Sequence, residues 1–270
     1  MSTYLSEIVA AHRAAAARDR RDLSELVDRA LASPATGGFR KALAGEGGLG
    51  IIAEVKRRSP SKGDLAPDLD PGATARSYRA GGARCLSVLT DADYFGGSPA
   101  DLAAAKAATD LPVLRKDFTV SPNDVCDARI MGADAILLIV AALGDDELGG
   151  LSSLADRLGL DVLVEVHDEG ELARALELDA SMVGVNQRDL HTFAVDERRA
   201  ERLVAAMPDD VVAVAESGIR DAADARRLAD AGYQGILVGE TLVRSADRAA
   251  AVAGLAGHRV GPRAGGQRHP

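Results

Sequence analysis

From residue 51 onward, one pattern of hydrophobic and polar positions repeats along the chain. A run of Val, Ile, Leu and Ala ends in polar residues, a loop follows, and then comes a stretch with helical spacing of apolar residues. The apolar runs predict strands at residues 51–55, 84–89, 111–115, 134–139, 161–165, 181–186, 211–216 and 235–239. The other stretches predict helices at residues 71–80, 99–108, 122–130, 145–158, 168–178, 195–206, 220–231 and 247–256. Apolar strands that alternate with helices are typical of a parallel sheet covered by helices.

These strand–helix units could close into a barrel or form an open, doubly wound sheet. Their regular succession, without a substantial interruption, favours an α/β fold of the closed (β/α)8 type, a TIM barrel. Several helix starts support the boundaries, because Asp70, Ser98 and Ser121 each offer a capping oxygen and precede a Pro at the first helical position. We therefore assign the barrel to residues 49–257.

Two further segments flank the barrel. Residues 4–32 are rich in Ala, Leu, Arg and Glu, and their apolar positions predict one amphipathic helix within an N-terminal extension of residues 1–48. An amphipathic helix needs an apolar surface to cover, so we expect this one to pack over the barrel mouth and help close a pocket there. Residues 258–270 are rich in Gly, Pro, Arg and His, and they predict a disordered tail.

Composition narrows the class of protein. The 270 residues are 47% hydrophobic and 27% charged, and the net charge of -9 argues against a general surface for nucleic acid or for an anionic membrane. The two cysteines, Cys85 and Cys126, are isolated and suggest neither a disulfide framework nor a thiolate metal cluster. We find no apolar run that could span a bilayer and no signal peptide, so we expect a cytoplasmic protein.

The C-terminal ends of the predicted strands carry polar and charged residues. In a barrel these ends meet at one mouth, where active sites lie. The residues concerned are Glu54, Lys56, Arg115, Lys116, Asp117, Phe118, Glu165, Asn186, Arg188, Glu216, Ser217, Gly218, Gly239 and Glu240. One such residue is usually a solvated loop charge. Because side chains from several strand ends converge, the set favours an active site.

The first strand shows this pattern most clearly. Glu54 and Lys56 are two residues apart, so on a strand both side chains point to the same side. The strand then leads into a Ser-Pro-Ser-Lys-Gly loop. This stretch alone fits an edge strand with a solvated charge cluster equally well. The polar residues at the other strand ends favour a position at the barrel mouth instead.

Several longer motifs fall in order at the predicted strand ends, from about residue 50 to about residue 245. They are Glu54-Val-Lys-Arg-Arg-Ser-Pro-Ser, Ser87-Val-Leu-Thr-Asp, Leu114-Arg-Lys-Asp-Phe, Glu165-Val-His, Asn186-Gln-Arg-Asp-Leu, Ala215-Glu-Ser-Gly-Ile and Leu237-Val-Gly-Glu. Together they resemble the signature of the indole-3-glycerol phosphate synthases, whose members also carry an extension before the barrel. Gln187 departs from the family pattern, which has a second Asn there, and we expect Gln187 to touch solvent or a neighbouring loop.

The resemblance implies a carboxy-lyase of tryptophan biosynthesis that uses no metal or other cofactor. Its reaction closes the ring of 1-(2-carboxyphenylamino)-1-deoxyribulose 5-phosphate, with loss of carbon dioxide and water, and gives indole-3-glycerol phosphate. A lysine ammonium can donate a proton and clamp developing negative charge. By resemblance, Lys116 is the general acid of closure, Lys56 pairs with the substrate carboxylate and assists dehydration, and Glu165 is the base.

The resemblance also implies supporting roles. Glu54 and Glu216 would orient the lysines and the substrate, and Asn186 would bond to a substrate hydroxyl or carboxylate. Backbone amides and hydroxyls suit a phosphate, and loops after strands seven and eight often hold one in barrels. The phosphate-binding candidates are Ser59, Ser217, Gly218, Gly239 and the backbone amide of Glu240. The candidates for an apolar wall around the aryl ring are Phe118, Leu137, Tyr94 and Phe95, and Arg188 is a further substrate-binding candidate.

Without the family resemblance, the residues leave two other functions open. Another phosphosugar barrel, such as a phosphoribosyl isomerase, would not need the lysine-rich first loop. A non-catalytic phosphate-binding barrel would not need Lys56, Lys116 and Glu165 together. We interpret His167 and His191 as loop residues, because no spacing suits a metal site. The expected partner is a small phosphorylated molecule, and the sequence leaves open both the oligomeric state and association with other tryptophan-pathway enzymes.

Overall fold

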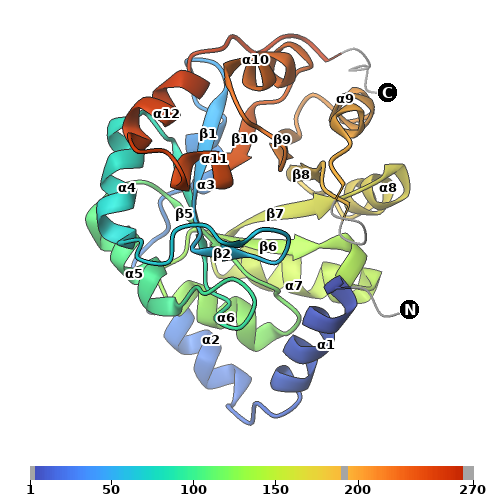
Figure 1. The fold of residues 1–270 in the computed structure, drawn as a ribbon. Helices are drawn as coiled ribbons and strands as arrows, with labels where there is room; N and C mark the ends of the chain where they lie inside the picture. The colour runs from blue at the N-terminus through green and yellow to red at the C-terminus, as the bar shows by residue number, and fades with distance from the viewer. Residues whose placement is uncertain (1–3, 190–193, 264–270) are drawn as a thin grey trace.

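The computed structural model describes residues 4–189 and 194–263, and within these residues eight parallel strands close into a barrel (Figure 1). The barrel strands are β1 (Gly50–Val55), β4 (Cys85–Leu89), β5 (Val113–Lys116), β6 (Ala135–Ile139), β7 (Asp161–Val166), β8 (Met182–Asn186), β9 (Val212–Glu216) and β10 (Gly235–Val238). Neighbours in sequence are neighbours in the barrel, and β10 pairs with β1 to close it. The predicted closed barrel is confirmed, and the predicted strand bounds agree with the observed ones to within two residues.

The predicted helices form the outer layer around the strands (Figure 1). They are α4 (Pro71–Ala80), α5 (Pro99–Ala108), α6 (Pro122–Ile130), α7 (Asp145–Arg157), α8 (Glu169–Glu177), α9 (Glu197–Ala205), α10 (Ala222–Asp230) and α12 (Arg248–Leu255). Asp70, Ser98 and Ser121 cap their helices as predicted, each accepting the N–H three residues on. Among the described residues, no helix has both the length and the apolar character needed to cross a membrane.

Several short elements in the loops were not predicted. They are the hairpin of β2 (Arg58–Ser59) and β3 (Gly63–Asp64), the 3-10 helix η1 (Val140–Ala142) and the helix α11 (Glu240–Val243). The hairpin lies in the loop after β1 and α11 directly follows β10, so both stand at the barrel mouth (Figure 1). Elements of two to four residues have too few positions to show a period in the sequence.

Alternation along the strands separates an inner from an outer apolar cluster. On β1, Ile52 belongs to the cluster inside the barrel, whereas Ala53 and Val55 belong to the one between strands and helices. Because side chains two apart share a face, the residue two positions after an inner one also points inward. The inner apolar residues that stand two positions before a polar strand end are Ile52, Leu114, Leu163 and Val214. The polar residues after them are therefore directed into the mouth.

The helix α3 (Phe39–Leu43) closes the opposite end of the barrel. Phe39 and Leu43 are fully buried and belong to the inner cluster. A Cβ at Gly235 would lie 2.9 Å from Leu43 Cδ2, so this strand has to begin with a glycine for α3 to fit. The extension thus contributes part of the barrel core. The division into residues 1–48 and 49–257 stays a prediction.

The prediction of one helix over residues 4–32 is wrong. The segment forms α1 (Tyr4–Ala16) and α2 (Leu23–Leu31), joined by a turn (Figure 1). The Asp22 carboxylate starts α2 by accepting the N–H groups of Ser24 and Glu25, and this cap was the local signal for the break. The two helices cover different surfaces, since α2 packs against α6 and α1 lines the cavity at the mouth.

The disordered tail predicted from residue 258 does not begin there. Residues 258–263 have neither helix nor strand, yet the His258 carbonyl accepts the N–H of Leu49 at 2.8 Å. The Arg263 guanidinium donates to Val211 O and Gln234 Oε1 at 2.6 and 2.5 Å. Burial lowers the pKa of Arg263. The composition of residues 258–263 did not show that Arg263 donates hydrogen bonds to several carbonyl oxygens on the barrel. Residues 264–270 of the predicted tail lie outside the described residues.

A buried carboxylate joins the extension to the strands. Asp134 is 1% exposed, and it accepts the N–H groups of Gly37 and Val113 at 2.6 and 2.7 Å. It also forms an ion pair with Lys106. The carboxylate therefore holds the segment before α3, the start of β5 and the helix α5 together.

We expect Asp134→Ala to lower the free energy of unfolding by about 2–4 kcal/mol, because two N–H groups and an ammonium would lose their acceptor. Urea unfolding followed by circular dichroism measures this change. The control is Asp110→Ala, which removes an ion pair between the exposed side chains of Arg79 and Asp110 and should change stability little. Equal effects of the two substitutions would contradict the anchoring role of Asp134.

Candidate active site

Acidic, basic and amide side chains from five strands meet at the C-terminal mouth of the barrel. They are Glu54 and Lys56 from β1 and its end, Lys116 from β5, Glu165 from β7, Asn186 from β8 and Glu216 from β9. Glu54 is 3% exposed, and Glu165 and Glu216 are each 2% exposed. Carboxylates are rarely so deeply buried without partners, so the mouth needs compensating cations and donors.

Lys116 lies between two of these carboxylates. Its Nζ is 3.0 Å from Glu165 Oε2 and 3.3 Å from Glu216 Oε2, although β5 is not adjacent to β7 or β9 in the barrel. Burial disfavours the charged ammonium, but the charges of Glu165, Glu216 and Glu54 outweigh it and raise the pKa of Lys116. Lys116 is therefore a firmly protonated cation in this site.

The two carboxylates beside Lys116 have different electrostatic surroundings. Burial raises the pKa of Glu216 to about 7, and the charge of Glu165 acts in the same direction. Burial also disfavours the ionised form of Glu165, but Lys116 and His167 outweigh it and lower the pKa of Glu165. Glu216 Oε1 has no hydrogen-bond partner among the described residues. Glu165 is thus ionised at neutral pH, and Glu216 can exchange a proton there.

Lys56 and Glu54 point to the same side, as their spacing predicted, and they form a second ion pair. Gly239, at the end of β10, lies against this pair. A Cβ at Gly239 would overlap Glu54 Oε1 and lie 2.9 Å from Lys56 Nζ. Gly239 thus leaves the space that both side chains occupy.

A glycine inside β8 has the same function for Glu216, and sequence reasoning missed it. A Cβ at Gly184 would overlap Glu216 Oε1 and lie 3.2 Å from Leu163 Cδ1. A glycine within a strand often marks a place where another group approaches closely. That signal was present in the sequence, but it did not say which group approaches.

Asn186 forms hydrogen bonds both to Glu165, the residue predicted to be the base, and to the loop that follows β8. Its Nδ2 donates to Glu165 Oε1 at 3.2 Å, and its Oδ1 accepts the N–H of Arg188 at 3.0 Å. His167 also approaches Glu165, with Nε2 3.5 Å from Oε1, so the interpretation of His167 as an ordinary loop residue is incomplete. His191 lies outside the described residues.

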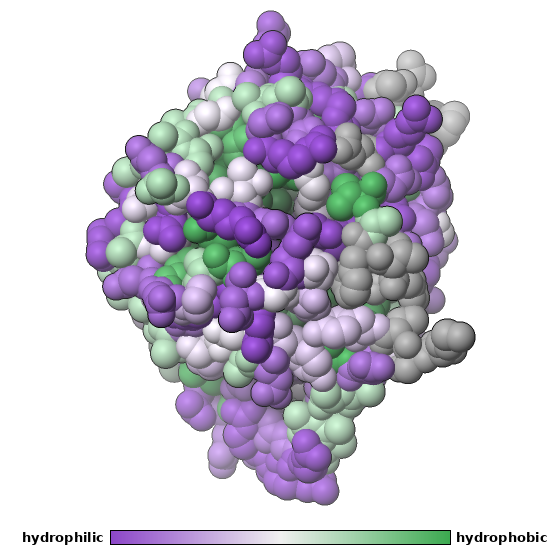
Figure 2. All heavy atoms as spheres, viewed as in Figure 1, coloured by the Kyte–Doolittle hydropathy of each residue, from purple (hydrophilic) through white to green (hydrophobic). Residues whose placement is uncertain are grey.

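One cavity of about 700 Å³ opens at the mouth, and the predicted site residues line it, with the exception of Tyr94. Figure 2 shows a hollow near the centre of this face, bordered by both hydrophilic and hydrophobic residues. The predicted site residues on the lining are Glu54, Lys56, Ser59, Lys116, Phe118, Leu137, Glu165, Asn186, Arg188, Glu216, Ser217, Gly218, Gly239 and Glu240. The roles assigned to them stay predictions.

Apolar side chains form one wall of the cavity, and α1 contributes to it. Phe118, Leu137 and Phe95 line the cavity as expected, whereas Tyr94 is not on the lining and makes an edge-to-face contact with Tyr4, with ring centroids 5.9 Å apart. Ile8 of α1 lines the same cavity. The expectation that the N-terminal helix covers the mouth agrees with this position.

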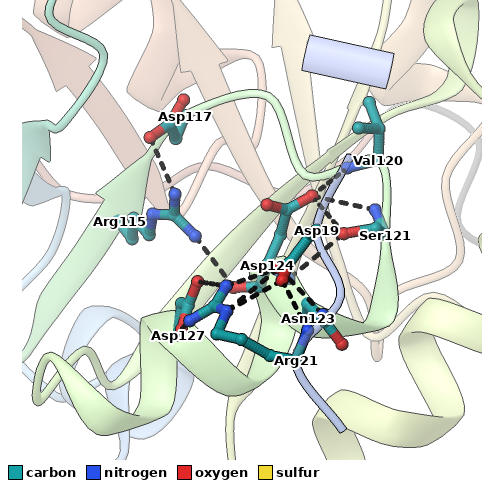
Figure 3. Close-up of polar contacts among 9 residues, drawn as sticks. All are labelled: Asp19, Arg21, Arg115, Asp117, Val120, Ser121, Asn123, Asp124 and Asp127. Carbon is teal, nitrogen blue, oxygen red and sulfur yellow. Dashed lines mark hydrogen bonds and ion pairs between the residues drawn. The ribbon is translucent and has the colours of Figure 1, made fainter. Parts of the chain in front are cut away.

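Polar contacts hold the loop that carries Lys116 and Phe118. Arg115 donates to Asp117 Oδ2 at 3.0 Å and to the Asp124 carbonyl at 2.8 Å (Figure 3). The turn between α1 and α2 joins the same region, because Arg21 bonds to Asp127 on α6. The extension therefore supports the β5–α6 loop from outside the barrel.

His12 on α1 reaches the same loop from the mouth. Its Nε2 lies 3.0 Å from Asp91 Oδ2 and 3.9 Å from Asp117 Oδ1, and its ring centroid is 5.2 Å from that of Phe118. The spacing of these three residues would suit a metal ion. Asp91 Oδ1 accepts two backbone N–H groups and Asp117 Oδ2 accepts a hydrogen bond from Arg115, while the other oxygen of each carboxylate faces His12. The cluster is accordingly a polar link between α1 and the barrel.

The opposite wall includes the turn after β9. Ser217 and Gly218 have φ of 66° and 73°, so two consecutive residues adopt the left-handed region. Gln187 holds this turn by donating to the Ser217 carbonyl at 2.7 Å. Gln187 touches a neighbouring loop, as expected, but it is 1% exposed and does not face solvent. Its supporting contact was not visible in the sequence.

The fold and the mouth define a barrel enzyme with a buried cluster of ionisable side chains at its C-terminal mouth. Comparison with known proteins identifies the family: residues 5–255 match the indole-3-glycerol phosphate synthase family model. The chain is 50% identical to an indole-3-glycerol phosphate synthase of Rhizorhabdus wittichii over 93% of this chain and 97% of that protein. It is 48% identical to one of Azospirillum brasilense over 94% and 99%. The chain belongs to the indole-3-glycerol phosphate synthase family.

Distant solved structures agree on the fold alone. A thiamine phosphate pyrophosphorylase from Pyrococcus furiosus superimposes with a TM-score of 0.59 at 18% identity, over 77% of this chain and 93% of that one. An N-acetylmannosamine-6-phosphate 2-epimerase from Clostridium perfringens gives a TM-score of 0.58 at 16% identity, over 72% and 88%. These likenesses support the barrel and say nothing about the reaction.

We expect Gly239→Ala to lower kcat/KM by about tenfold to a hundredfold, because the new methyl would displace Glu54 and Lys56 by a fraction of an ångström or more. Both groups are ends of flexible side chains, so the fold should persist. Steady-state kinetics and thermal unfolding measure the two effects. The control is Gly254→Ala, where a Cβ meets nothing within 4 Å. Full activity of Gly239→Ala would show that the close approach is not required.

Proposed function

We propose that this barrel closes the ring of 1-(2-carboxyphenylamino)-1-deoxyribulose 5-phosphate and releases carbon dioxide and water, giving indole-3-glycerol phosphate. The observation that carries the proposal is the placement of Lys116 between Glu165 and Glu216 in the cavity of a family member. The activity is that of a carboxy-lyase in tryptophan biosynthesis. Its reaction is redox-neutral, and the proposed steps use only side chains of this chain.

Ring closure needs positive charge at the ketone oxygen. As an aryl carbon attacks the ketone carbon, negative charge develops on that oxygen, and Lys116 supplies an ammonium to stabilise and protonate it. The raised pKa of Lys116 keeps this ammonium charged before substrate enters. A developing alkoxide is a stronger base than an amine, so proton donation to it is still favourable.

Loss of carbon dioxide and then of water restores aromaticity. Lys56 pairs with the substrate carboxylate during binding and assists departure of the hydroxyl in dehydration. Glu165 removes the ring proton, and its low pKa keeps it ionised and ready to accept that proton. Glu54 and Glu216 orient the two lysines, and Asn186 bonds to the substrate and to Glu165.

The apolar wall of the cavity suits the aryl ring of the substrate, and the opposite wall suits its phosphate. Phe118, Leu137 and Ile8 offer an apolar wall to the aryl ring. The phosphate lies against the backbone amides and hydroxyls of the opposite wall, where the paired left-handed residues expose the backbone. The phosphate-binding residues are Ser59, Ser217, Gly218, Gly239 and the amide of Glu240, with Arg188 as a further substrate contact.

We expect Lys116→Ala to lower kcat by about a hundredfold or more, because loss of a general acid typically costs that much. Fluorescence of the indole product, formed from the arylamino-deoxyribulose phosphate, measures the rate. Lys41→Ala is the control, since Lys41 is exposed on α3 at the other end of the barrel. Undiminished turnover by Lys116→Ala would refute its assignment as the acid.

We expect Glu165→Gln to release carbon dioxide in the first turnover without forming fluorescent product. The amide keeps the shape of the side chain but cannot accept the ring proton, so the reaction should stop after closure and decarboxylation. Rapid quench with mass spectrometry would detect the trapped species. Wild-type kinetics in this variant would remove Glu165 as the base, and loss of the carbon dioxide burst would place its role before closure.

A further inference from the structure

His167 directly follows β7 and is held by the helix after it. The backbone N–H of His167 donates to Glu171 Oε2 at 2.8 Å, and the ring Nδ1 lies 3.0 Å from the same oxygen. The His167 side chain is 12% exposed. Because Glu171 has no proton to offer when ionised, Nδ1 is the donor in this contact. The tautomer of the ring is thereby determined.

The other ring nitrogen of His167 points at the proposed base. Nε2 lies 3.5 Å from Glu165 Oε1, is buried, and has no hydrogen-bond partner among the described residues. With Nδ1 already carrying a proton, Nε2 presents either a second proton or a lone pair. A lone pair facing a carboxylate oxygen is repulsive, so the proton on Nε2 is favoured whenever Glu165 is ionised.

Charges from each surrounding element act on this ring. Burial and the Arg199 guanidinium on α9 disfavour a charged imidazole, whereas Glu171 on α8 and Glu165 on β7 favour it and raise the pKa of His167. On its other oxygen, Glu165 contacts Lys116 of β5. The Glu165 carboxylate thus lies between two cations, one on each oxygen.

We propose that His167, held by Glu171, is a positioning residue for Glu165: its protonated ring keeps the carboxylate ionised and oriented for removal of the ring proton. The inference rests on the role proposed above for Glu165. His167 itself need not touch the substrate. Its effect passes through the charge and the direction of one carboxylate oxygen.

The proposal predicts in which direction the pH–rate profile shifts when His167 is replaced. A cation beside Glu165 lowers the pKa of that carboxyl, so removing the cation raises it. The reaction needs ionised Glu165, and its rate therefore falls on the acidic side of the profile. Without His167 the acidic limb should move to higher pH, whereas a merely structural defect would lower the rate by the same factor at every pH.

The test is the pH profile of kcat and kcat/KM for His167→Asn, whose shorter amide can replace the Nδ1 donor but cannot carry a charge toward Glu165. We expect the acidic limb of the kcat profile to shift to higher pH by about one unit. At pH values below the limb, this shift lowers kcat by about tenfold, while KM stays nearly unchanged. Glu171→Gln should shift the limb in the same direction, because the ring loses the charge that stabilises its proton. If ring and carboxylate act as one unit, the double variant shifts no further than His167→Asn.

His258→Asn is the matched control, because its Nε2 is also buried without a partner but belongs to the segment at the other end of the barrel. It should keep the wild-type profile. A uniform loss at all pH values, or an unmoved limb in His167→Asn, would overturn the proposal. Thermal unfolding shows whether His167→Asn folds. If it does not, the pH profile of Glu171→Gln is the test: a shifted acidic limb supports the proposal, and an unmoved limb overturns it.

Glu165→Gln separates this inference from the proposed function. If that variant lacks the dehydration step while His167→Asn leaves the profile unchanged, only the positioning role fails. If Glu165→Gln turns over normally, the proposed base fails and the positioning role fails with it. A shifted limb in His167→Asn but not in Glu171→Gln would retain His167 and overturn the holding role of Glu171.

Discussion

The site depends on compensation between buried charges. Glu54, Glu165 and Glu216 are nearly inaccessible to water, and desolvated carboxylates are stable only beside cations or donors. Lys56 and Lys116 supply the cations, and Lys116 contacts carboxylates from two strands that are not its neighbours. Only a closed barrel brings such strands face to face. The low local dielectric that makes these charges costly also strengthens their action on a substrate.

Small residues and support from outside the mouth make this cluster geometrically feasible. Gly184 and Gly239 leave room for the ends of Glu216 and of the Glu54–Lys56 pair. The extension contributes twice, because α3 closes the far end of the barrel while α1 covers the mouth. Arg21 joins the extension to α6, and Arg115 joins α6 to the end of β5 beside Lys116 (Figure 3). The segment before the barrel is therefore part of the architecture of the site.

Two neighbouring carboxylates differ because their surroundings differ. Glu165 lies between Lys116 and His167, which keep it ionised, whereas Glu216 has one oxygen without a partner and a pKa raised to about 7. Environments that push two pKa values apart commonly separate an acid from a base. The ionised state of Glu165 agrees with the proton removal that we propose for it.

The sequence by itself determined the repeating elements, the helix caps and the shared direction of Glu54 and Lys56, because these depend on local periods of 2 and 3.6 residues. Through motifs at the strand ends and the family resemblance that they carry, it also indicated most of the residues that we placed on the cavity, but not Ile8 of α1. Tertiary structure decided the packed course of residues 258–263, the close approach at Gly184 and the contact of His167 with Glu165. Each of these depends on groups that lie on different elements, and the distance and charge between such groups exist only once the barrel has closed.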